Sequence, residues 1–169
     1  MVIPMATVQK ITINLWFDNQ AEEAVTFYTS IFKNSAIGRI VRYGKAGFEY
    51  HGKSEGTAMT VEFHLDGTPF VALNGGPQFQ FTEAVSFIVN CENQEEVDYF
   101  WDRLSEGGDP AAQQCGWLKD KFGVSWQIVP TEMIDMINDP DIERSQKVMS
   151  ALLQMKKLDL AELKRAYLS

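Results

Sequence analysis

The chain repeats one order of strand, helix and strands, and this repeat constrains the fold more than any other feature. An alternating apolar segment at 10–18 precedes a helical pattern at 21–32, and the same order returns at 84–90 and 94–105. The strands align at an offset of 72 residues (85 − 13) and the helices at an offset of 73 (94 − 21). Chance similarity of two amphipathic helices explains this less well than duplication, because order, capping residues and aromatic pairs all match.

The remaining patterns complete two modules and a helical end. Alternation predicts further strands at 37–43, 57–65, 70–74, 114–121 and 124–129. After Pro130 only helical patterns remain, at 132–137, 140–158 and 160–168. The sequence therefore predicts an α+β fold of paired βαβββ-like modules with a helical C-terminal extension. The expected parts are residues 8–77, 82–130 and 131–169, which we expect to form one compact unit.

Four helix starts carry side chains that can cap the first turn. The predicted capping pairs are Asn19 with Glu22, Asn93 with Glu96, Asp139 before Pro140, and Asp159 with Glu162. Such residues accept hydrogen bonds from the free N–H groups of a first turn, or fit its backbone geometry. These positions locate the helices more sharply than the apolar pattern alone.

Composition limits the classes of function. The 169 residues are 45% hydrophobic and 22% charged, which is typical of a globular domain, and the net charge is −8. An acidic surface repels phosphate backbones and anionic lipid, so we expect no nucleic-acid and no membrane partner. No apolar run approaches a membrane span, and no basic segment precedes an apolar one at the N-terminus, so we expect a cytoplasmic protein. The two cysteines, Cys91 and Cys115, are expected to be reduced thiols.

Strand alternation predicts which residues line an open sheet face. In segment 57–65 the residues Met59, Val61, Phe63 and Leu65 form one face, and this apolar face must be covered by helices. Glu62 and His64 then lie on the opposite, open face. The same parity places Asn14 and Trp16 from the first strand and Gln127 from the last strand on open faces. Polar groups among apolar walls favour a small-molecule pocket, and a merely solvated sheet face is the alternative.

Two histidines invite functional hypotheses. Glu62 and His64 are neighbours on one strand face and could exchange a proton near neutral pH, or simply form a structural ion pair. His51 lies in a glycine-punctuated loop, where it is either solvated or part of a lid. The chain contains no G-x-G-x-x-G turn, no P-loop and no G-x-S-x-G elbow, so dinucleotide, P-loop nucleotide and α/β-hydrolase sites are unsupported.

Several segments together resemble a known family. They are Ile13–Asp18, Ala21–Ala24 with Phe27-Tyr28, Met59–Phe63, Ala72–Pro77, Ala84–Phe87 and Cys115–Gln127. They are similar to the PhnB-like family of the vicinal-oxygen-chelate superfamily, which includes glyoxalases, extradiol dioxygenases and bleomycin-resistance proteins. The resemblance runs from about Ile11 to the C-terminal helices, and Asp120–Gln127 is its most specific part. It implies paired βαβββ modules that form a cleft, usually in a homodimer.

The resemblance also bears on the chemistry. Members of the family often carry the label demethylubiquinone methyltransferase, but no turn here would hold adenosylmethionine in the usual way. In metal-dependent relatives the ligands come from positions that match Thr12 (or Ile11), Val71, Ala84 and Gln127. Of these, only Gln127 is a suitable ligand, and a divalent metal needs three or more oxygen or nitrogen ligands. We therefore expect no metal and no cofactor; the alternative is a replacement metal site formed by Glu62, His64 and Gln127.

The resulting hypothesis is a metal-free, homodimeric protein that binds an aromatic or amphipathic small molecule in a cleft, as antibiotic-binding relatives do. Trp16 and Trp117 would supply stacking surface, and the polar anchors would be Asn14, Glu62, His64 and Gln127. We also expect Glu62 to point into the cleft near Trp16 and Gln127. One alternative is an enzyme that uses Glu62 or His64 as general acid or base; another is a vestigial pocket and an acidic surface that contacts partners. The sequence does not identify the ligand.

Overall fold

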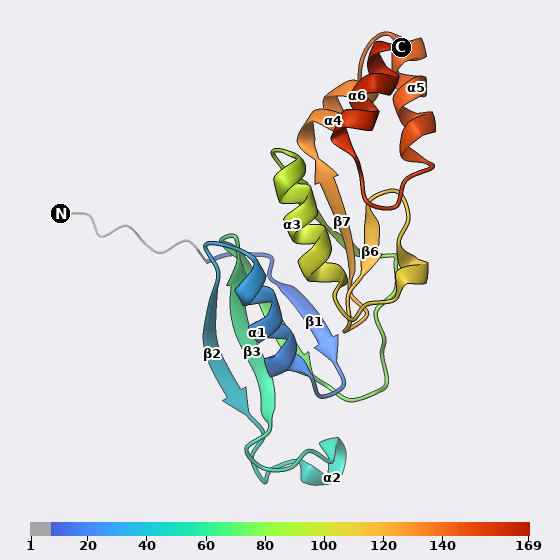
Figure 1. The fold of residues 1–169 in the computed structure, drawn as a ribbon. Coiled ribbons are helices and arrows are strands. Elements are labelled where there is room, and N and C mark those ends of the chain that lie inside the picture. Colours follow the sequence, from blue (N-terminus) through green and yellow to red (C-terminus); the bar gives the residue numbers. More distant parts are fainter. Residues whose placement is uncertain (1–7) are drawn as a thin grey trace, which may run out of the picture. The chain divides into compact units, whose positions relative to one another are not determined.

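The computed structural model describes residues 8–169 (Figure 1). The chain divides into two compact units, Met1–Gln80 and Phe81–Ser169. This division falls within the short segment that separates the two predicted modules, and the helical extension belongs to the second unit.

The first unit is a four-stranded sheet with one long helix on it (Figure 1). Its elements are β1 (Ile13–Phe17), α1 (Ala21–Ile31), β2 (Ala36–Arg42), α2 (Phe48–His51), β3 (Ala58–Leu65) and β4 (Thr68–Asn74). The strand order is β1-β4-β3-β2, with β1 parallel to β4 and the other neighbours antiparallel. An Asp-Gly hairpin joins β3 to β4, and both Asp66 and Gly67 have the positive φ that such a turn requires.

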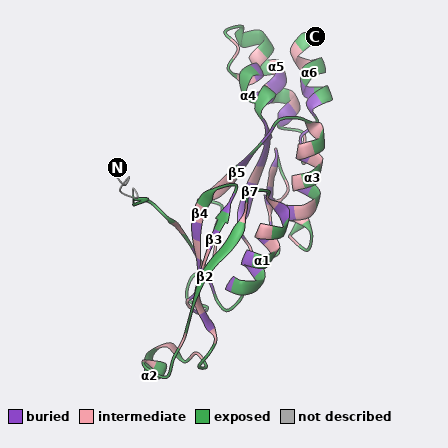
Figure 2. Cartoon of the chain, turned by 90° about the vertical axis from the view of Figure 1, so that its left-hand side faces the viewer, coloured by how far each residue is buried: buried purple, intermediate pink, exposed green. Residues whose placement is uncertain are grey.

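Strand parity in the first unit follows the sequence pattern from Val61 onwards, whereas Met59, also predicted on the covered face, is only half-buried and its neighbour Ala58 is buried. Leu15, Phe17, Val61, Phe63 and Leu65 are buried, and so are Ala24, Val25 and Tyr28 of α1. These side chains form the core between α1 and one face of the sheet. The edge strand β2 is exposed along its whole length, as Figure 2 shows in green. The opposite face of the sheet is therefore the one that the pattern left open.

The predicted cap of α1 is wrong. Gln20, not Asn19, is the N-cap residue, and its side chain makes no capping hydrogen bond. The Ala21 N–H instead donates to Asn74 Oδ1 over 2.9 Å, and the Asn74 Nδ2 donates to the carbonyl of Ala58 over 3.0 Å. A buried side chain at the end of β4 thus satisfies the helix terminus.

The second unit has the same topology with one strand fewer. Its elements are β5 (Ser86–Cys91), α3 (Gln94–Ser105), the 3₁₀ helix η1 (Pro110–Ala112), β6 (Trp117–Lys119), β7 (Ser125–Pro130), α4 (Thr131–Ile137), α5 (Ile142–Leu152) and α6 (Leu160–Leu168). The strand order is β5-β7-β6, with β5 parallel to β7, as β1 is to β4. No counterpart of β2 occurs among the described residues, and η1 packs against β6. The strand predicted at 114–121 is shortened to β6.

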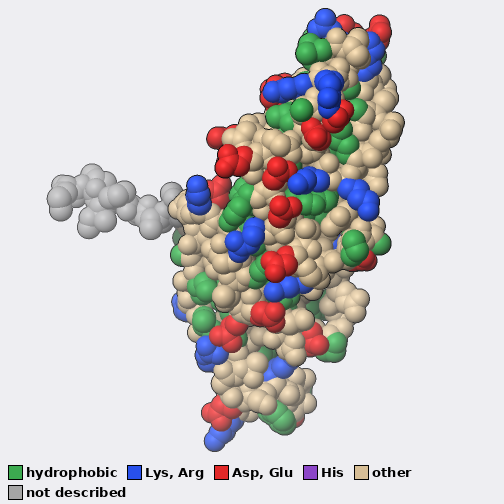
Figure 3. All heavy atoms as spheres, in the orientation of Figure 1, with side chains coloured by type: hydrophobic (Ala, Val, Ile, Leu, Met, Phe, Trp, Pro, Cys, Tyr) green, Lys and Arg blue, Asp and Glu red, His purple; other side chains and the backbone are tan. Residues whose placement is uncertain are grey.

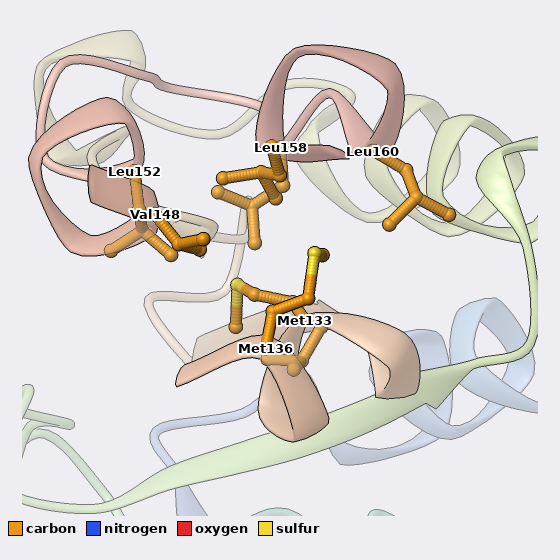
Figure 4. Close-up of a cluster of buried hydrophobic side chains, with 8 residues drawn as sticks. Met133, Met136, Val148, Leu152, Leu158 and Leu160 are labelled. Atoms are coloured by element: carbon orange, nitrogen blue, oxygen red, sulfur yellow. The ribbon is translucent and has the colours of Figure 1, made fainter. Parts of the chain in front are cut away.

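The extension builds a core of its own. Figure 4 shows Met133 and Met136 of α4 directed towards side chains of α5, α6 and the segment between them. The cluster comprises Val129, Met133, Met136, Val148, Leu152, Leu158, Leu160 and Leu163. Gln94 of α3 ties this segment to the module, because its amide donates to the carbonyl of Leu158 and accepts from the N–H of Leu160. The extension is thus continuous with the second module.

The predicted capping residue is confirmed at two of the three other helix starts. Asn93 accepts from the N–H of Glu96, and Asp159 accepts from the N–H of Glu162, both as predicted. The third start differs, because α5 begins at Ile142 with Asp141 as its cap and ends at Leu152. Asp139 accepts from the N–H of Asp141 and so belongs to the preceding turn.

Asp120–Gln127, the segment in which the family resemblance is most specific, has a structural role. Asp120 is buried, and its Oδ1 accepts from the N–H groups of Phe122 and Val124 over 2.8 and 3.0 Å. Its Oδ2 accepts from the indole Nε1 of Trp126 over 2.8 Å. One carboxylate therefore fixes both the turn between β6 and β7 and a core tryptophan.

The surface is charged and mixed. Basic and acidic side chains are interspersed over the face that Figure 3 shows. Among the described residues, no helix has the length and apolar character that crossing a membrane demands.

Candidate functional site

The open face of the first sheet carries the residues that the sequence placed there. Backbone pairing aligns Asn14 with Val71 and Val71 with Glu62, which makes one row across three strands. A second row joins Trp16, Leu73 and Thr60 in the same way. Because directly paired residues point to the same side of a sheet, each row lies on one face. His64 has the parity of Glu62, so the four predicted residues of this unit share the face opposite α1.

Trp16 is held in a defined position. Its indole Nε1 donates to the carbonyl of Gly76 over 2.9 Å, and its ring meets the ring of Phe79 edge-on, with centroids 4.9 Å apart. Gly75 lies directly under the indole, since a Cβ there would be 2.3 Å from the ring. A glycine is therefore required for this close approach. The indole is half-buried, so part of the ring stays accessible.

Glu62 is paired with Arg39, a residue that the strand pattern does not indicate. Its Oε1 accepts from Arg39 of β2 over 2.5 Å, and the two side chains are 41% and 74% exposed. The hydrogen bond and the charge of Glu62 raise the pKa of Arg39. The pairing of β2 with β3 shifts register between Ile37 and Ile40, which brings Arg39 opposite Glu62. Such irregularities are not visible as simple alternation in a sequence. His64 is exposed and lies between Ala36 and Pro69 in the sheet.

His51 orders the loop that follows β2. Its Nδ1 accepts from the N–H of Lys53 over 2.9 Å, so the proton of the neutral ring sits on Nε2, which lies 3.3 Å from the carbonyl of Ala46. The imidazole also packs against Tyr43, with ring centroids 4.5 Å apart. The Lys53 ammonium donates to the carbonyl of Asp18 at the end of β1 over 2.9 Å. These contacts tie the loop to the first sheet.

Trp117 and Gln127 are neighbours in the second sheet. They are directly paired between β6 and β7, and Gln127 is also paired with Ile88 of β5. The Gln127 amide donates to the hydroxyl of Ser86 over 2.9 Å. On the same strand, the buried hydroxyl of Ser125 lacks a hydrogen-bond partner among the described residues. The two predicted residues of this unit thus share one face, which parity had assigned for Gln127 alone.

The donor set does not fit a divalent metal. Val71 and Ala84 carry no ligand atom, and the Gln127 amide is engaged by Ser86. Within residues 8–169, no group of three or more histidine, cysteine, aspartate or glutamate side chains is arranged to hold an ion. The positions that hold metal in relatives therefore offer at most one amide and one hydroxyl, from Gln127 and Thr12, which is too few for such a site.

Neither cysteine has the surroundings of an activated nucleophile. Both thiols are free. Burial, with a smaller contribution from the charge of Glu96, raises the pKa of Cys91 to about 12. Cys115 lies against the core of the extension. A protonated, buried thiol such as that of Cys91 is a structural group.

Comparisons with known proteins agree with this architecture. The family model described as 3-demethylubiquinone-9 3-methyltransferase matches residues 9–129. A PhnB protein from Bacillus cereus, provisionally described as a 3-demethylubiquinone-9 3-methyltransferase, is 39% identical, with a TM-score of 0.61, and the match covers 72% of this chain and 99% of that one. Protein PA1353 from Pseudomonas aeruginosa is 17% identical, with a TM-score of 0.53 over 72% and 96% of the two chains, which shows likeness of fold alone. No curated protein matches the chain. The family match ends before the helical extension.

Proposed function

Because the chain belongs to the 3-demethylubiquinone-9 3-methyltransferase family, the PhnB-like branch of the vicinal-oxygen-chelate superfamily, we propose that it binds a small molecule without a metal. The ligand is aromatic or amphipathic and packs on the open face of the first sheet. The family supplies the fold but not the chemistry of this chain, whose residues must be considered individually.

The half-buried indole of Trp16 carries this proposal. A hydrogen bond to Gly76, an edge contact with Phe79 and the absence of a side chain at Gly75 hold the ring in place. A large aromatic surface that is fixed and accessible loses little conformational entropy when a ligand packs on it. The half-buried Val71 and Leu73 continue the apolar surface on β4.

Polar groups around this surface give the site its amphipathic character. Asn14 is exposed on β1, and the ion pair of Glu62 with Arg39 lies two strands away from it. His64 is exposed beside that pair. Such groups orient a ligand whose apolar part rests on Trp16. In the second unit Trp117 and Gln127 form an aromatic and amide pair, and we propose that a ligand also packs on that face of the second sheet.

The test uses 8-anilinonaphthalene-1-sulfonate, an aromatic amphipathic probe whose emission rises when it binds. We expect saturable binding that Trp16→Ala weakens by about ten-fold, the effect of losing a large part of one aromatic contact. The matched control is Ile142→Ala, which removes a 76% exposed apolar side chain from the extension. Equal loss in both variants would mean that the probe binds apolar surface without selectivity, and would contradict the proposal.

The alternative function is catalysis by Glu62 or His64 as general acid or base. The contact that bears on it is the Arg39 guanidinium, which forms an ion pair with Glu62 and would also stabilise negative charge on a reacting carbonyl. Glu62→Gln and His64→Gln separate the alternatives. Loss of turnover of a carbonyl or quinone-like substrate with unchanged binding would support catalysis, and loss of binding alone would support the binding function.

We further propose that the protein is a homodimer in the cytoplasm. The exposed edge of β2 would need cover, and two-fold pairing is the commonest form of assembly. Light scattering at tens of micromolar should give twice the mass of one chain, and a monomer mass would contradict this part of the proposal.

A further inference from the structure

Two aromatic side chains from opposite edges of the first sheet reach the same short segment. The Trp16 indole, from edge strand β1, donates to the carbonyl of Gly76 over 2.9 Å. The Tyr43 hydroxyl, just beyond edge strand β2, donates to the carbonyl of Asn74 over 2.7 Å. These two carbonyl groups are two residues apart at the end of β4. Both aromatic residues are thus anchored to one point of the main chain.

Both side chains lie on the open side of the sheet. The pairing of Trp16 with Leu73 and Thr60 places the indole there. Arg42 forms an ion pair with Glu22 of α1, so it points to the helix-covered side. Tyr43 continues the pairing, since its N–H donates to the carbonyl of Thr57. Successive side chains alternate between faces, so Tyr43 points away from the helix.

Each ring has an aromatic neighbour, and the indole takes the space that a side chain at position 75 would need. His51 packs against Tyr43 with centroids 4.5 Å apart, and Phe79 meets Trp16 at 4.9 Å. Gly75 lies between the two anchoring carbonyls. Tyr43 and Trp16 are both half-buried, so each keeps accessible ring surface.

We propose that Trp16 and Tyr43 together bind a flat aromatic ring on the open face of the first sheet. This deepens the proposed function and rests on it, because it names the class of ligand for the same face. The polar atoms of both side chains donate to the main chain, which leaves mainly their ring surfaces for a ligand. A flat ring gains stacking and edge contacts with two such surfaces, whereas a saturated ring of equal size gains only apolar burial. Tyr43 is therefore a binding residue, and Gly75 positions Trp16.

The experiment compares 2-naphthol with its saturated counterpart decahydro-2-naphthol by isothermal titration calorimetry on the full chain. We expect the native protein to bind 2-naphthol roughly ten-fold more tightly than the saturated alcohol. Tyr43→Leu should weaken 2-naphthol binding about five-fold and leave the binding of decahydro-2-naphthol nearly unchanged. Tyr43→Phe, which keeps the ring, should retain most of the affinity. Gly75→Ala should weaken 2-naphthol binding because the new methyl group displaces the indole.

The outcomes distinguish this inference from the proposed function. If Trp16→Ala weakens both alcohols equally and Tyr43→Leu affects neither, the flat-ring site is overturned and general binding on the face survives. If neither alcohol binds and the amide resonances of residues 71–76 do not move at millimolar concentrations, both proposals fail. Should Tyr43→Leu not fold, Tyr43→Phe and Gly75→Ala still decide, since unchanged 2-naphthol affinity in Gly75→Ala overturns the inference.

Discussion

The two modules share a topology but use their polar residues differently. In the first, polar side chains such as Asn14 and Glu62 lie on an accessible sheet face. In the second, the polar residue of the most recognisable segment, Asp120, is buried and makes hydrogen bonds to main chain and to Trp126. The segment that identifies the family most clearly therefore serves the fold of the second module. Accessible polar groups of the first module are the better candidates for binding.

The modules also differ in how their sheets are completed. The first has β2 as its fourth strand, whereas the second has three strands and is joined to helices α4–α6. Cys115 and Gly116, just before β6, donate their N–H groups to the carbonyls of Met155 and Lys156. The extension thus satisfies main-chain groups of the shorter module. It lies beyond residues 9–129, the part of this chain that the family model matches.

The largest expected effect concerns Asp120. Asp120→Asn replaces a carboxylate oxygen by an NH₂ group, which cannot accept from one of its buried donors. The variant should lower the free energy of unfolding by about 3 kcal/mol. Urea denaturation followed by circular dichroism measures this. The control is Asp135→Asn at an exposed position of α4. If Asp120→Asn lowers the free energy of unfolding no more than Asp135→Asn does, the buried carboxylate does not stabilise the second module.

The first module has one buried polar residue of the same kind, Asn74. Asn74→Ala removes the acceptor of the Ala21 N–H and the donor to the Ala58 carbonyl, and should cost about 2 kcal/mol. Asn19→Ala tests the cap that the sequence suggested and should be nearly neutral. Chemical denaturation of both variants decides between the two residues. A larger cost at Asn19 would contradict the assignment of the cap.

Cys91 gives the second module an alkaline sensitivity. Its pKa is raised from 9.0 to about 12 in the folded protein. Between these values the unfolded thiol loses its proton while the folded thiol keeps it, so stability falls as pH rises and is unaffected by this group below pH 9. At pH 10 this amounts to about 1 kcal/mol. Both cysteines of the chain lie in the second unit, so the first module makes no such thiol contribution to stability.

The measurement is the unfolding free energy from pH 8 to pH 10 for the native chain and Cys91→Ala. The variant is less stable at every pH because of the cavity it creates, but its decline with pH should be shallower by the contribution of one thiol. Parallel curves for the two proteins would show that Cys91 has no such role.

The smallest effect on stability is expected at Glu62. Glu62→Gln breaks a surface ion pair with Arg39, and the midpoint of thermal unfolding should shift by less than about 2 °C. Ligand affinity should fall in the same variant if Glu62 anchors the ligand. Differential scanning fluorimetry and calorimetry measure the two quantities. A large loss of stability with unchanged affinity would assign Glu62 to a structural ion pair.

Much of the fold could be predicted because it depends on local chemistry. Alternation located the strands that form the core, and Asn93 and Asp159 cap helices within their own segments. The errors arise where a distant residue intervenes. The cap of α1 comes from Asn74, which is 53 positions from Ala21 in the sequence. The apolar pattern predicted three strands in the second module and three are found, although the one predicted at 114–121 is shortened to β6.

The candidate site shows the same division. Parity correctly placed Asn14, Trp16, Glu62 and His64 on one face. Arg39 and Tyr43 were not predicted, because their contacts depend on the register of β2 against β3, which shifts twice. An exposed arginine beside a glycine, as in Gly38-Arg39, is a weak signal of such an irregularity. Whether the six candidate residues share one ligand stays a prediction.

The four tryptophans divide unevenly between the two units, so their NMR signals can follow the units separately. Of the four tryptophans in the sequence, Trp16 alone falls in the first unit, and Trp101, Trp117 and Trp126 fall in the second. Incorporating 5-fluorotryptophan should give four ¹⁹F lines, one of which reports the open face directly. That single line can follow ligand titration while the other three follow the integrity of the second unit, within one sample and without any substitution.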